Sequence, residues 1–305
     1  MKRVAISIGD LNGIGIEIAL RAHKKISKMV EPIYIIDKKM LKLASKLLQI
    51  PIPKDFKTLA PNASYFKIKA GKVSKKSGAY SFASFKKAIE LAKNKKVDAI
   101  CTLPIHKEAW MKAGLEYVGH TDYLRKYFQK EAIMMLGCPK LYVALYTEHI
   151  PLKKVPNKIR SKKLKNFLLD FAKSISSKKQ IAVLGLNPHA GDNGVLGNEE
   201  AKIKKAIKKA NKTLKKELFI GPIVPDIAFT PHFRKNFQYF VAMYHDQGLA
   251  PLKALYFEES INVSLNLPIL RTSVDHGTAF DIAYKQKDIN LISYTNAIEF
   301  IKNSL

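Results

Sequence analysis

Short apolar runs alternate with segments of helical periodicity along almost the whole sequence, and this alternation restricts the possible folds more than any other feature. The expected strands are Val4–Gly9, Pro32–Asp37, Tyr65–Lys69, Val97–Leu103, Leu141–Tyr146, Ile181–Leu186, Phe240–Tyr244 and Ile261–Leu265. The expected helices are Ile14–Ile26, Met40–Leu48, Ala83–Lys95, Asn157–Lys173, Glu199–Leu218 and Thr278–Lys285. This order predicts an α/β fold with a largely parallel sheet flanked by helices. A chain of 305 residues is also long enough for two lobes.

The net charge of +28 raises the question of whether the partner is a nucleic acid. Only six of the 53 basic residues are Arg, the side chain that phosphate and base recognition favours. The densest run of lysines, KIKKAIKKANKTLKKEL at 202–218, has the pattern of an amphipathic helix and contains no aromatic residue. We therefore expect a solvated helix face and no nucleic-acid partner, with the charge attracting anionic substrates and cofactors.

The compartment can be judged from the N-terminus and the cysteines. The apolar stretch after Met1 is interrupted by Asp10, Asn12 and Glu17, so it does not have the pattern of a signal peptide. No stretch approaches the roughly 18 uncharged apolar residues of a membrane span. With only two cysteines, both in apolar surroundings, a disulfide framework is not expected. These features predict a cytoplasmic protein with no membrane partner.

Three of the eight histidines, His149, His189 and His245, come just after expected strands. In open α/β sheets, ligands bind beyond the carboxyl ends of the strands. Three neutral imidazoles would suit Zn²⁺ or a similar divalent ion, but their position alone is also explained by three separate loop histidines. The sequence His245-Asp246-Gln247-Gly248 alone is also typical of a polar turn, with Gly248 supplying a positive φ.

Two further stretches have features of cofactor sites. The loop GDLNGIG at 9–15 follows the first strand, but Ile18 stands at the third glycine position of a dinucleotide fingerprint, so a close strand-to-helix turn explains it equally well. The stretch Asp275-His276-Gly277-Thr278 leads into an expected helix whose first N–H groups could meet a phosphate or an adenosine. A helix cap would need only one of its polar residues.

Six motifs carry a resemblance to a known family. They are CTLPIHKEAW at 101–110, GHTD at 119–122, HIPL at 149–152, GLNPHAGDNG at 185–194, AMYHDQGLAPLK at 242–253 and INVSLNLPILRTSVDHGTAFDIA at 261–283. On these motifs the chain resembles 4-hydroxythreonine-4-phosphate dehydrogenase, an enzyme of pyridoxal phosphate synthesis, over essentially its whole length. The resemblance implies a fold similar to isocitrate and isopropylmalate dehydrogenases. Residues 1–305 would form a single catalytic chain of two α/β lobes with the active site in the cleft between them.

The resemblance also implies roles for individual residues. The metal ligands for Zn, Mg or Co would be His149, His189 and His245. The substrate-binding residues would be His120, Thr121, Lys253, Asn262 and Arg271. The segment Asp275, His276, Gly277 and Thr278 is similar to the adenosine-contacting loop of the distant relatives, so it would bind NAD or NADP. A homodimer with the active site at its interface is implied as well. For proton transfer, Lys253 and Asp246 are the candidates, with Asp246 alternatively supporting a metal-binding histidine.

The reaction implied is a metal-assisted oxidation of 4-phospho-hydroxy-L-threonine to 2-amino-3-oxo-4-phosphooxybutanoate, which decarboxylates to 3-amino-2-oxopropyl phosphate. The alternative is a related dehydrogenase acting on 4-phospho-threonate or 4-phospho-erythronate. Two positions depart from the usual family pattern. Leu11-Asn12 replaces a common Pro-Ala, and Asp122 replaces Glu, a change that keeps the charge.

Overall fold

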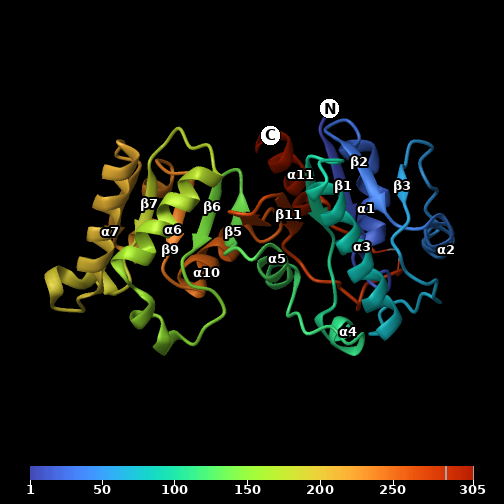
Figure 1. Cartoon of the computed structure of the whole chain (residues 1–305), viewed down its shortest axis with the longest axis horizontal. Helices are drawn as coiled ribbons and strands as arrows, with labels where there is room; N and C mark the ends of the chain where they lie inside the picture. The colour runs from blue at the N-terminus through green and yellow to red at the C-terminus, as the bar shows by residue number, and fades with distance from the viewer. Residues whose placement is uncertain (286, 305) are drawn as a thin grey trace. The chain divides into compact units, whose positions relative to one another are not determined.

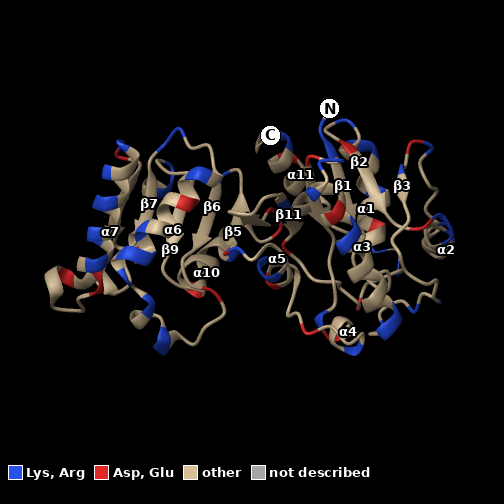
Figure 2. Ribbon diagram, in the orientation of Figure 1, with Lys and Arg blue, Asp and Glu red and all other residues tan. Residues whose placement is uncertain are grey.

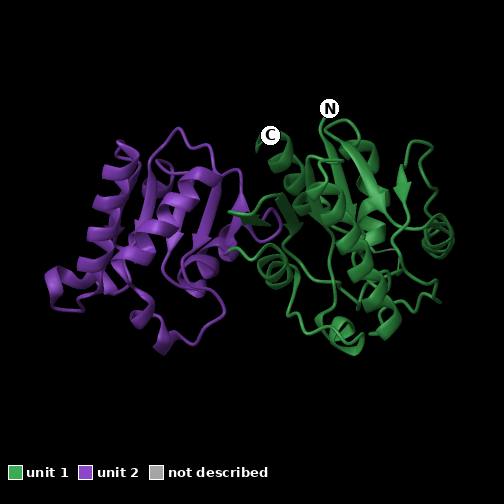
Figure 3. Cartoon of the chain, viewed as in Figure 1, with its two compact units in different colours: residues 1–130, 261–305 green, residues 131–260 purple. Residues whose placement is uncertain are grey.

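A computed structural model of the chain describes residues 1–285 and 287–304. The chain forms two compact units (Figure 3). Unit 1 comprises Met1–Lys130 and Ile261–Leu305, and unit 2 comprises Glu131–Ser260. The chain therefore leaves unit 1 once, completes unit 2 as one continuous segment, and returns to finish unit 1.

Unit 1 contains a sheet whose strands are parallel except at one edge (Figure 1). Its strands are β1 (Arg3–Ser7), β2 (Glu31–Ile35), β3 (Thr58–Leu59), β4 (Ala99–Thr102), β10 (Ile261–Leu265) and β11 (Leu270–Val274). They lie in the order β3-β2-β1-β4-β11-β10. Only the β10–β11 pair is antiparallel, so β11 lies parallel to β4 although some 170 residues separate them.

The helices of unit 1 pack their apolar residues against this sheet. They are α1 (Gly15–Ile26), α2 (Lys38–Leu48), α3 (Lys75–Lys93), α4 (Lys107–Lys112), α5 (His120–Phe128) and α11 (Ile292–Ser304). α3 contacts β1, β2 and β4, whereas α11 contacts β10, β11 and α1. Phe85 of α3 and Trp110 of α4 are fully buried in one core cluster. The Trp110 Nε1–H donates to the Ser81 Oγ at 2.8 Å, which satisfies the polar atom of this large buried ring.

Unit 2 contains five strands, which are also largely parallel. Its strands are β5 (Ile133–Cys138), β6 (Leu141–Leu145), β7 (Ile181–Leu184), β8 (Phe219–Ile223) and β9 (Tyr239–Ala242). They lie in the order β5-β6-β9-β7-β8, and only the β5–β6 pair is antiparallel. The predicted α/β fold with a largely parallel sheet flanked by helices is confirmed.

The helical segments of unit 2 are α6 (Ser161–Ser174), α7 (Glu199–Leu214), α8 (Pro225–Ala228), α9 (Pro231–Arg234) and α10 (His245–Tyr256), with short turns η1 (Leu152–Lys154), η2 (Pro156–Lys158) and η3 (Pro188–Gly194). α7 packs against α6 and β8 with Ile203, Ala206, Ile207 and Ala210 buried. Its lysines lie on the remaining surface, as the amphipathic pattern predicted (Figure 2). No helix within the described ranges is both long and apolar enough to cross a bilayer.

Several sequence-based expectations about these elements are wrong. Tyr65–Lys69 is not a strand, and the short β3 lies before it at Thr58–Leu59. The segment Thr278–Lys285 forms turns and no helix. The HDQG segment is the first turn of α10, and Gly248 does not have a positive φ. A Cβ at Gly248 would lie 2.5 Å from the Val143 Cγ1, so the glycine allows α10 to pack closely on the sheet.

Candidate functional site

The three histidines expected to bind a metal all lie in unit 2, beyond the ends of adjacent strands. His149 follows β6, His245 follows β9 and His189 follows β7. β9 lies between β6 and β7 and is parallel to both. The carboxyl ends of parallel neighbours lie at the same edge of a sheet, so the fold brings these three chain positions to one edge.

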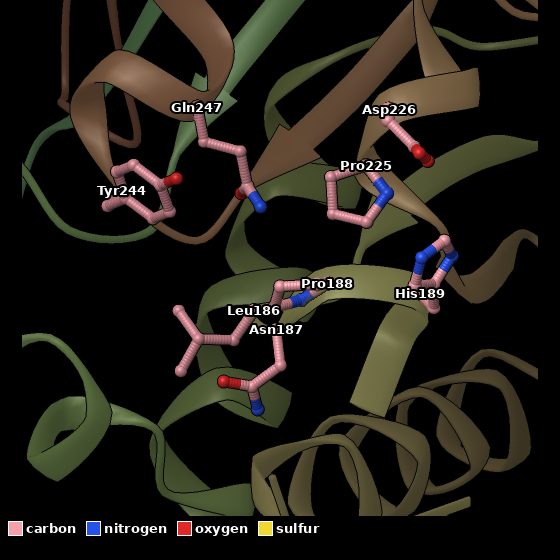
Figure 4. A pocket seen from close by; sticks show the side chains of 8 residues that line it. All are labelled: Leu186, Asn187, Pro188, His189, Pro225, Asp226, Tyr244 and Gln247. Carbon is pink, nitrogen blue, oxygen red and sulfur yellow. The ribbon is translucent and has the colours of Figure 1, made fainter. Parts of the chain in front are cut away.

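Two of the three rings are adjacent. The ring centroids of His149 and His245 are 5.3 Å apart. His189 and Tyr244 line opposite sides of a pocket of about 260 Å³, and Asp226 of α8 also lines it (Figure 4). Gln247 joins the ends of β9 and β7 at this pocket, because it accepts from the Met243 N–H at 2.7 Å and donates to the Gly185 oxygen at 2.6 Å.

The three histidines are suitable ligands for a divalent metal ion. Imidazole nitrogens bind such ions, and all three residues follow strands at one edge of the sheet. Across residues 1–285 and 287–304, however, no three His, Cys, Asp or Glu side chains are grouped closely enough to hold an ion together. The structure therefore brings His149 and His245 together and leaves the His189 ring outside a completed set of three ligands.

The backbone is strained at two of these histidines. His149 has φ 30°, and His189 has φ 51°. In the loop of His189, all five residues from 189 to 193 are in the left-handed region. Left-handed geometry costs about 1–2 kcal/mol for each residue that has a Cβ. Such strain persists only where the surroundings enforce it, and it is concentrated at functional sites.

A carboxylate orients the His245 ring. The Asp246 Oδ1 lies 2.6 Å from the His245 Nδ1. Because an ionised carboxylate can only accept, the His245 Nδ1 carries the proton, and the lone pair of Nε2 remains for a ligand. Of the two roles considered for Asp246, this contact favours support of a histidine.

In unit 1, strand register gathers polar side chains around Arg271. On β11, Arg271 lies opposite Ser264 of β10 and Ile100 of β4, and side chains two residues apart share a face. Asn262, Ser264 and Thr102 therefore lie on the same face as Arg271. The guanidinium donates to the Thr102 Oγ1 from Nε at 3.1 Å and from Nη2 at 2.7 Å. Its Nη1 donates to the Ser264 Oγ at 3.2 Å and the Asn262 Oδ1 at 3.4 Å.

All these acceptors are neutral, although Arg271 is only 2% exposed. No carboxylate in the described part of the chain lies within ion-pair distance of it, and burial lowers the pKa of Arg271 from 12.5 to about 10. A buried cation without a counter-ion is costly, so this cluster is suited to bind an anion.

His120, the first residue of α5, completes the cluster. Its Nδ1 lies 3.2 Å from the Arg271 Nη2, which can only donate. Burial, and then the charge of Arg271, holds the pKa of His120 well below its usual value, so the ring is neutral with its proton on Nε2. That Nε2 is buried and has no hydrogen-bond partner among the described residues. It supplies an unused donor next to a cation.

Thr121 lies in the same cluster, with its Oγ1 3.4 Å from the Ser264 Oγ. The structure thus brings together four of the five expected substrate-binding residues, His120, Thr121, Asn262 and Arg271. The fifth, Lys253, lies on α10 of unit 2, with its Nζ 5.2 Å from the Phe257 ring centroid. Sequence reasoning missed Thr102 and Ser264. The signal was a buried polar residue on each of two strands, but only the register shows that they meet.

The expected cofactor-binding segment, 275–278, packs against the first glycine loop of unit 1. The Ile14 N–H donates to the Thr278 oxygen at 3.1 Å, and the Tyr284 hydroxyl donates to the Leu11 oxygen at 2.7 Å. A Cβ at Gly13 would lie 2.7 Å from the Thr278 oxygen, which explains the glycine by close packing. Because residues 278–285 form turns and no helix, helix N–H groups cannot serve as the predicted anion donors here.

The two departures from the family pattern have local explanations. The Asn12 Nδ2 donates to the Lys72 oxygen at 2.6 Å, and the Asn12 Oδ1 accepts from the Lys69 N–H at 2.9 Å. Asn12 therefore fastens the segment 69–72 to the glycine loop. Asp122 accepts from the Val118 N–H at 3.2 Å through its Oδ2, next to the start of α5.

Comparison with known proteins identifies similar sequences and structures. The family model of the pyridoxal phosphate biosynthetic protein PdxA matches residues 28–301. The chain is 63% identical over 297 residues to the 4-hydroxythreonine-4-phosphate dehydrogenase of Sulfurimonas denitrificans, covering 97% of this chain and 96% of that protein. It is 57% identical over 301 residues to the enzyme of that name from Campylobacter fetus, covering 98% and 97%. A putative 4-hydroxythreonine-4-phosphate dehydrogenase from Salmonella typhimurium superposes with a TM-score of 0.84 at 32% identity, over 100% of both chains.

Proposed function

The chain belongs to the family of the pyridoxal phosphate biosynthetic protein PdxA, and we propose that it oxidises 4-phospho-hydroxy-L-threonine at its 3-hydroxyl group. The family match confirms the resemblance read from the motifs. Because its curated relatives are 4-hydroxythreonine-4-phosphate dehydrogenases, the chain is an oxidoreductase of pyridoxal phosphate biosynthesis. The product would be 2-amino-3-oxo-4-phosphooxybutanoate, which loses CO₂ to give 3-amino-2-oxopropyl phosphate.

The observation that carries the proposal from the structure is the buried Arg271 with only neutral hydrogen-bond acceptors. A phosphate or carboxylate group of the substrate would supply the missing negative charge. The planar guanidinium forms charge-assisted hydrogen bonds with such groups, and the unpaired His120 Nε2–H adds a neutral donor. The Thr121 hydroxyl, beside Ser264, is a further donor of the right size for an oxyanion.

The three histidines of unit 2 would hold a divalent cation, Zn, Mg or Co. When bound, a divalent cation lowers the pKa of a hydroxyl group and stabilises charge that develops on oxygen, and a nicotinamide accepts a hydride. Asp246 would keep the proton of His245 on Nδ1, so that its Nε2 faces the ion. His189 would have to bring its ring to the other two to complete the set.

The remaining roles are parts of the same proposal. Lys253 would hold or move the proton released from the substrate hydroxyl. Residues 275–278 would contact the adenosine part of NAD or NADP. A homodimer in the cytoplasm is implied by the family resemblance, and light scattering would test it by a mass of about twice 34.3 kDa.

The deciding experiment is turnover of 4-phospho-hydroxythreonine by the purified protein with NAD and with NADP, each with and without a chelator. Turnover that requires a cofactor and disappears on chelation would support the proposal. A higher kcat/KM for 4-phospho-threonate or 4-phospho-erythronate would replace the substrate but keep the reaction class. Failure to oxidise any of the three would contradict it.

A further inference from the structure

Glu200, in the first turn of α7, is a buried carboxylate directed at the loop that carries His189. It is only 8% exposed. Its Oε1 accepts from the main-chain N–H groups of Leu186 and Asn187, both at 2.8 Å. Its Oε2 accepts from the Asn187 Nδ2 at 2.8 Å. Three hydrogen bonds therefore join one side chain to the two residues that precede Pro188 and His189.

We propose that Glu200 is a positioning residue that fixes the start of the metal-binding loop and so sets the place from which His189 reaches the ion. The inference rests on the proposed role of His189 as a metal ligand. It concerns no contact between Glu200 and the ion, because all the hydrogen bonds of Glu200 go to the loop.

The loop needs such an anchor because its own geometry is unfavourable. The five residues from His189 to Asn193 are all left-handed. A segment in that region keeps its shape only when surrounding contacts over-determine it. The loop packs closely against both Asn187 and Glu200, with no room for a side chain at two of its glycines. A Cβ at Gly197 would lie 2.2 Å from the Asn187 Nδ2, and a Cβ at Gly191 would lie 2.7 Å from the Glu200 Oε2. Glu200 and Asn187 thus lie where the loop closes on itself.

A carboxylate suits this place better than any other side chain. Both of its oxygens accept without donating, and three N–H donors converge on them. No Lys or Arg in the described part of the chain forms an ion pair with Glu200. Its charge is instead compensated by these N–H groups and by the N-terminus of α7. Bonds to an ionised acceptor are stronger than bonds between neutral groups.

The neighbouring Glu199 provides a matched control. It lies in the same turn of α7 and also binds Asn187, with its Oε2 2.9 Å from the Nδ2. This hydrogen bond lowers the pKa of Glu199. Unlike Glu200, Glu199 is partly exposed and forms no hydrogen bond with the main chain of Leu186 or Asn187. Its replacement changes the charge near the helix N-terminus by the same amount but leaves the three hydrogen bonds of Glu200 to Leu186 and Asn187 in place.

The test measures Co²⁺ affinity by isothermal titration calorimetry in the full chain, with circular dichroism melting to verify folding. We expect Glu200→Ala to raise the Co²⁺ Kd about 10- to 100-fold, the usual cost of losing an outer support of a metal ligand. Glu200→Gln should have a smaller effect, because its amide oxygen can still accept the two main-chain N–H groups. Glu199→Gln should bind Co²⁺ like the wild type. If Glu200 only stabilised the fold, its replacement would lower the melting temperature and leave the Kd of the folded protein unchanged.

Each outcome either supports or overturns the proposed role of Glu200. An unchanged Co²⁺ Kd in folded Glu200→Ala overturns the inference. If that variant does not fold, Glu200→Gln and Glu199→Gln are compared, and equal affinities overturn it. A His189→Ala control separates the two hypotheses. If His189→Ala loses Co²⁺ while the Glu200 variants keep it, only the role of Glu200 fails. If His189→Ala binds Co²⁺ as tightly as the wild type, the proposed metal site fails, and the role of Glu200 fails with it.

Discussion

Replacing Arg271 with Met would show whether the polar cluster around Arg271 in unit 1 serves ligand binding or folding. Met fills a similar volume without charge. The fall in the pKa of Arg271 from 12.5 to about 10 corresponds to a cost of about 3 kcal/mol for keeping the side chain charged in the folded protein. Arg271→Met removes this cost. It also removes five hydrogen bonds to neutral acceptors, each with a net value of about 1 kcal/mol.

The two effects largely cancel in the absence of a ligand. We therefore expect the free energy of unfolding of Arg271→Met to lie within about 3 kcal/mol of the wild type, as measured by urea denaturation. Substrate binding should change much more. Loss of one partner of a buried charge-assisted contact costs about 2–5 kcal/mol, which is about a 30-fold to several-thousand-fold rise in Kd. Calorimetry with 4-phospho-hydroxythreonine measures it.

A matched control is Arg21→Met. Arg21 is also in unit 1, but it is more exposed and pairs with the Glu17 Oε1 at 2.7 Å. Because the Glu17 carboxylate is only 1% exposed, the loss of this partner should lower the free energy of unfolding by up to about 3–5 kcal/mol but leave substrate binding unchanged. The reasoning would be refuted if Arg271→Met kept the wild-type substrate Kd while losing more stability than this balance allows. Arg271 would then be a structural residue.

Three further outcomes are expected. Because the pKa of His120 is well below 6.5 in the folded protein, only the unfolded chain takes up this proton, so stability should fall as the pH drops below 6.5, by up to about 1.4 kcal/mol per pH unit. His120→Gln should make urea denaturation curves between pH 7.5 and 5.5 less pH-dependent, and an unchanged slope would contradict the neutral ring. Asp246→Asn should weaken Co²⁺ binding about 10- to 100-fold through His245, and full affinity would exclude that support. Lys253→Ala should keep Co²⁺ binding but lose turnover, and normal turnover would remove Lys253 from the chemistry.

The fold class could be predicted from the sequence. Parallel strands that are buried on both faces appear as short apolar runs, and these runs alternate with helical segments along the chain. The misassigned segments are those whose local pattern is overruled by contacts from far along the chain. The alternation at Tyr65–Lys69 predicts a strand, but the Lys69 N–H pairs with the side chain of Asn12 and not with a neighbouring strand. In 278–285, Ala279 and Tyr284 have φ 44° and 62°, which no helix tolerates, and the Tyr284 hydroxyl is held by Leu11.

The candidate site, like the fold, could be predicted from the sequence only in part. The place of a histidine after each of three strands could be read from the sequence, since it depends only on local strand ends. The polar cluster around Arg271 could not be predicted from the sequence in this way, because β11 was not expected and its polar residues interrupt the apolar pattern. Only pairing with β4 and β10 shows that Thr102 and Ser264 share a face with Arg271. The resemblance to a family supplied Arg271 but not these two partners.

The discontinuous course of unit 1 has a consequence for synthesis on the ribosome. β10 and β11 belong to unit 1 but are encoded after all of unit 2. Chains fold from the N-terminus as they are made, so a nascent chain can form the five strands of unit 2 while the strands of unit 1 still end at β4. The unpaired edge of β4 must then wait for more than 150 further residues before β11 covers it. During that interval the edge of β4 can pair with strands of other chains, so we expect chaperones that bind nascent chains to be needed most at this edge.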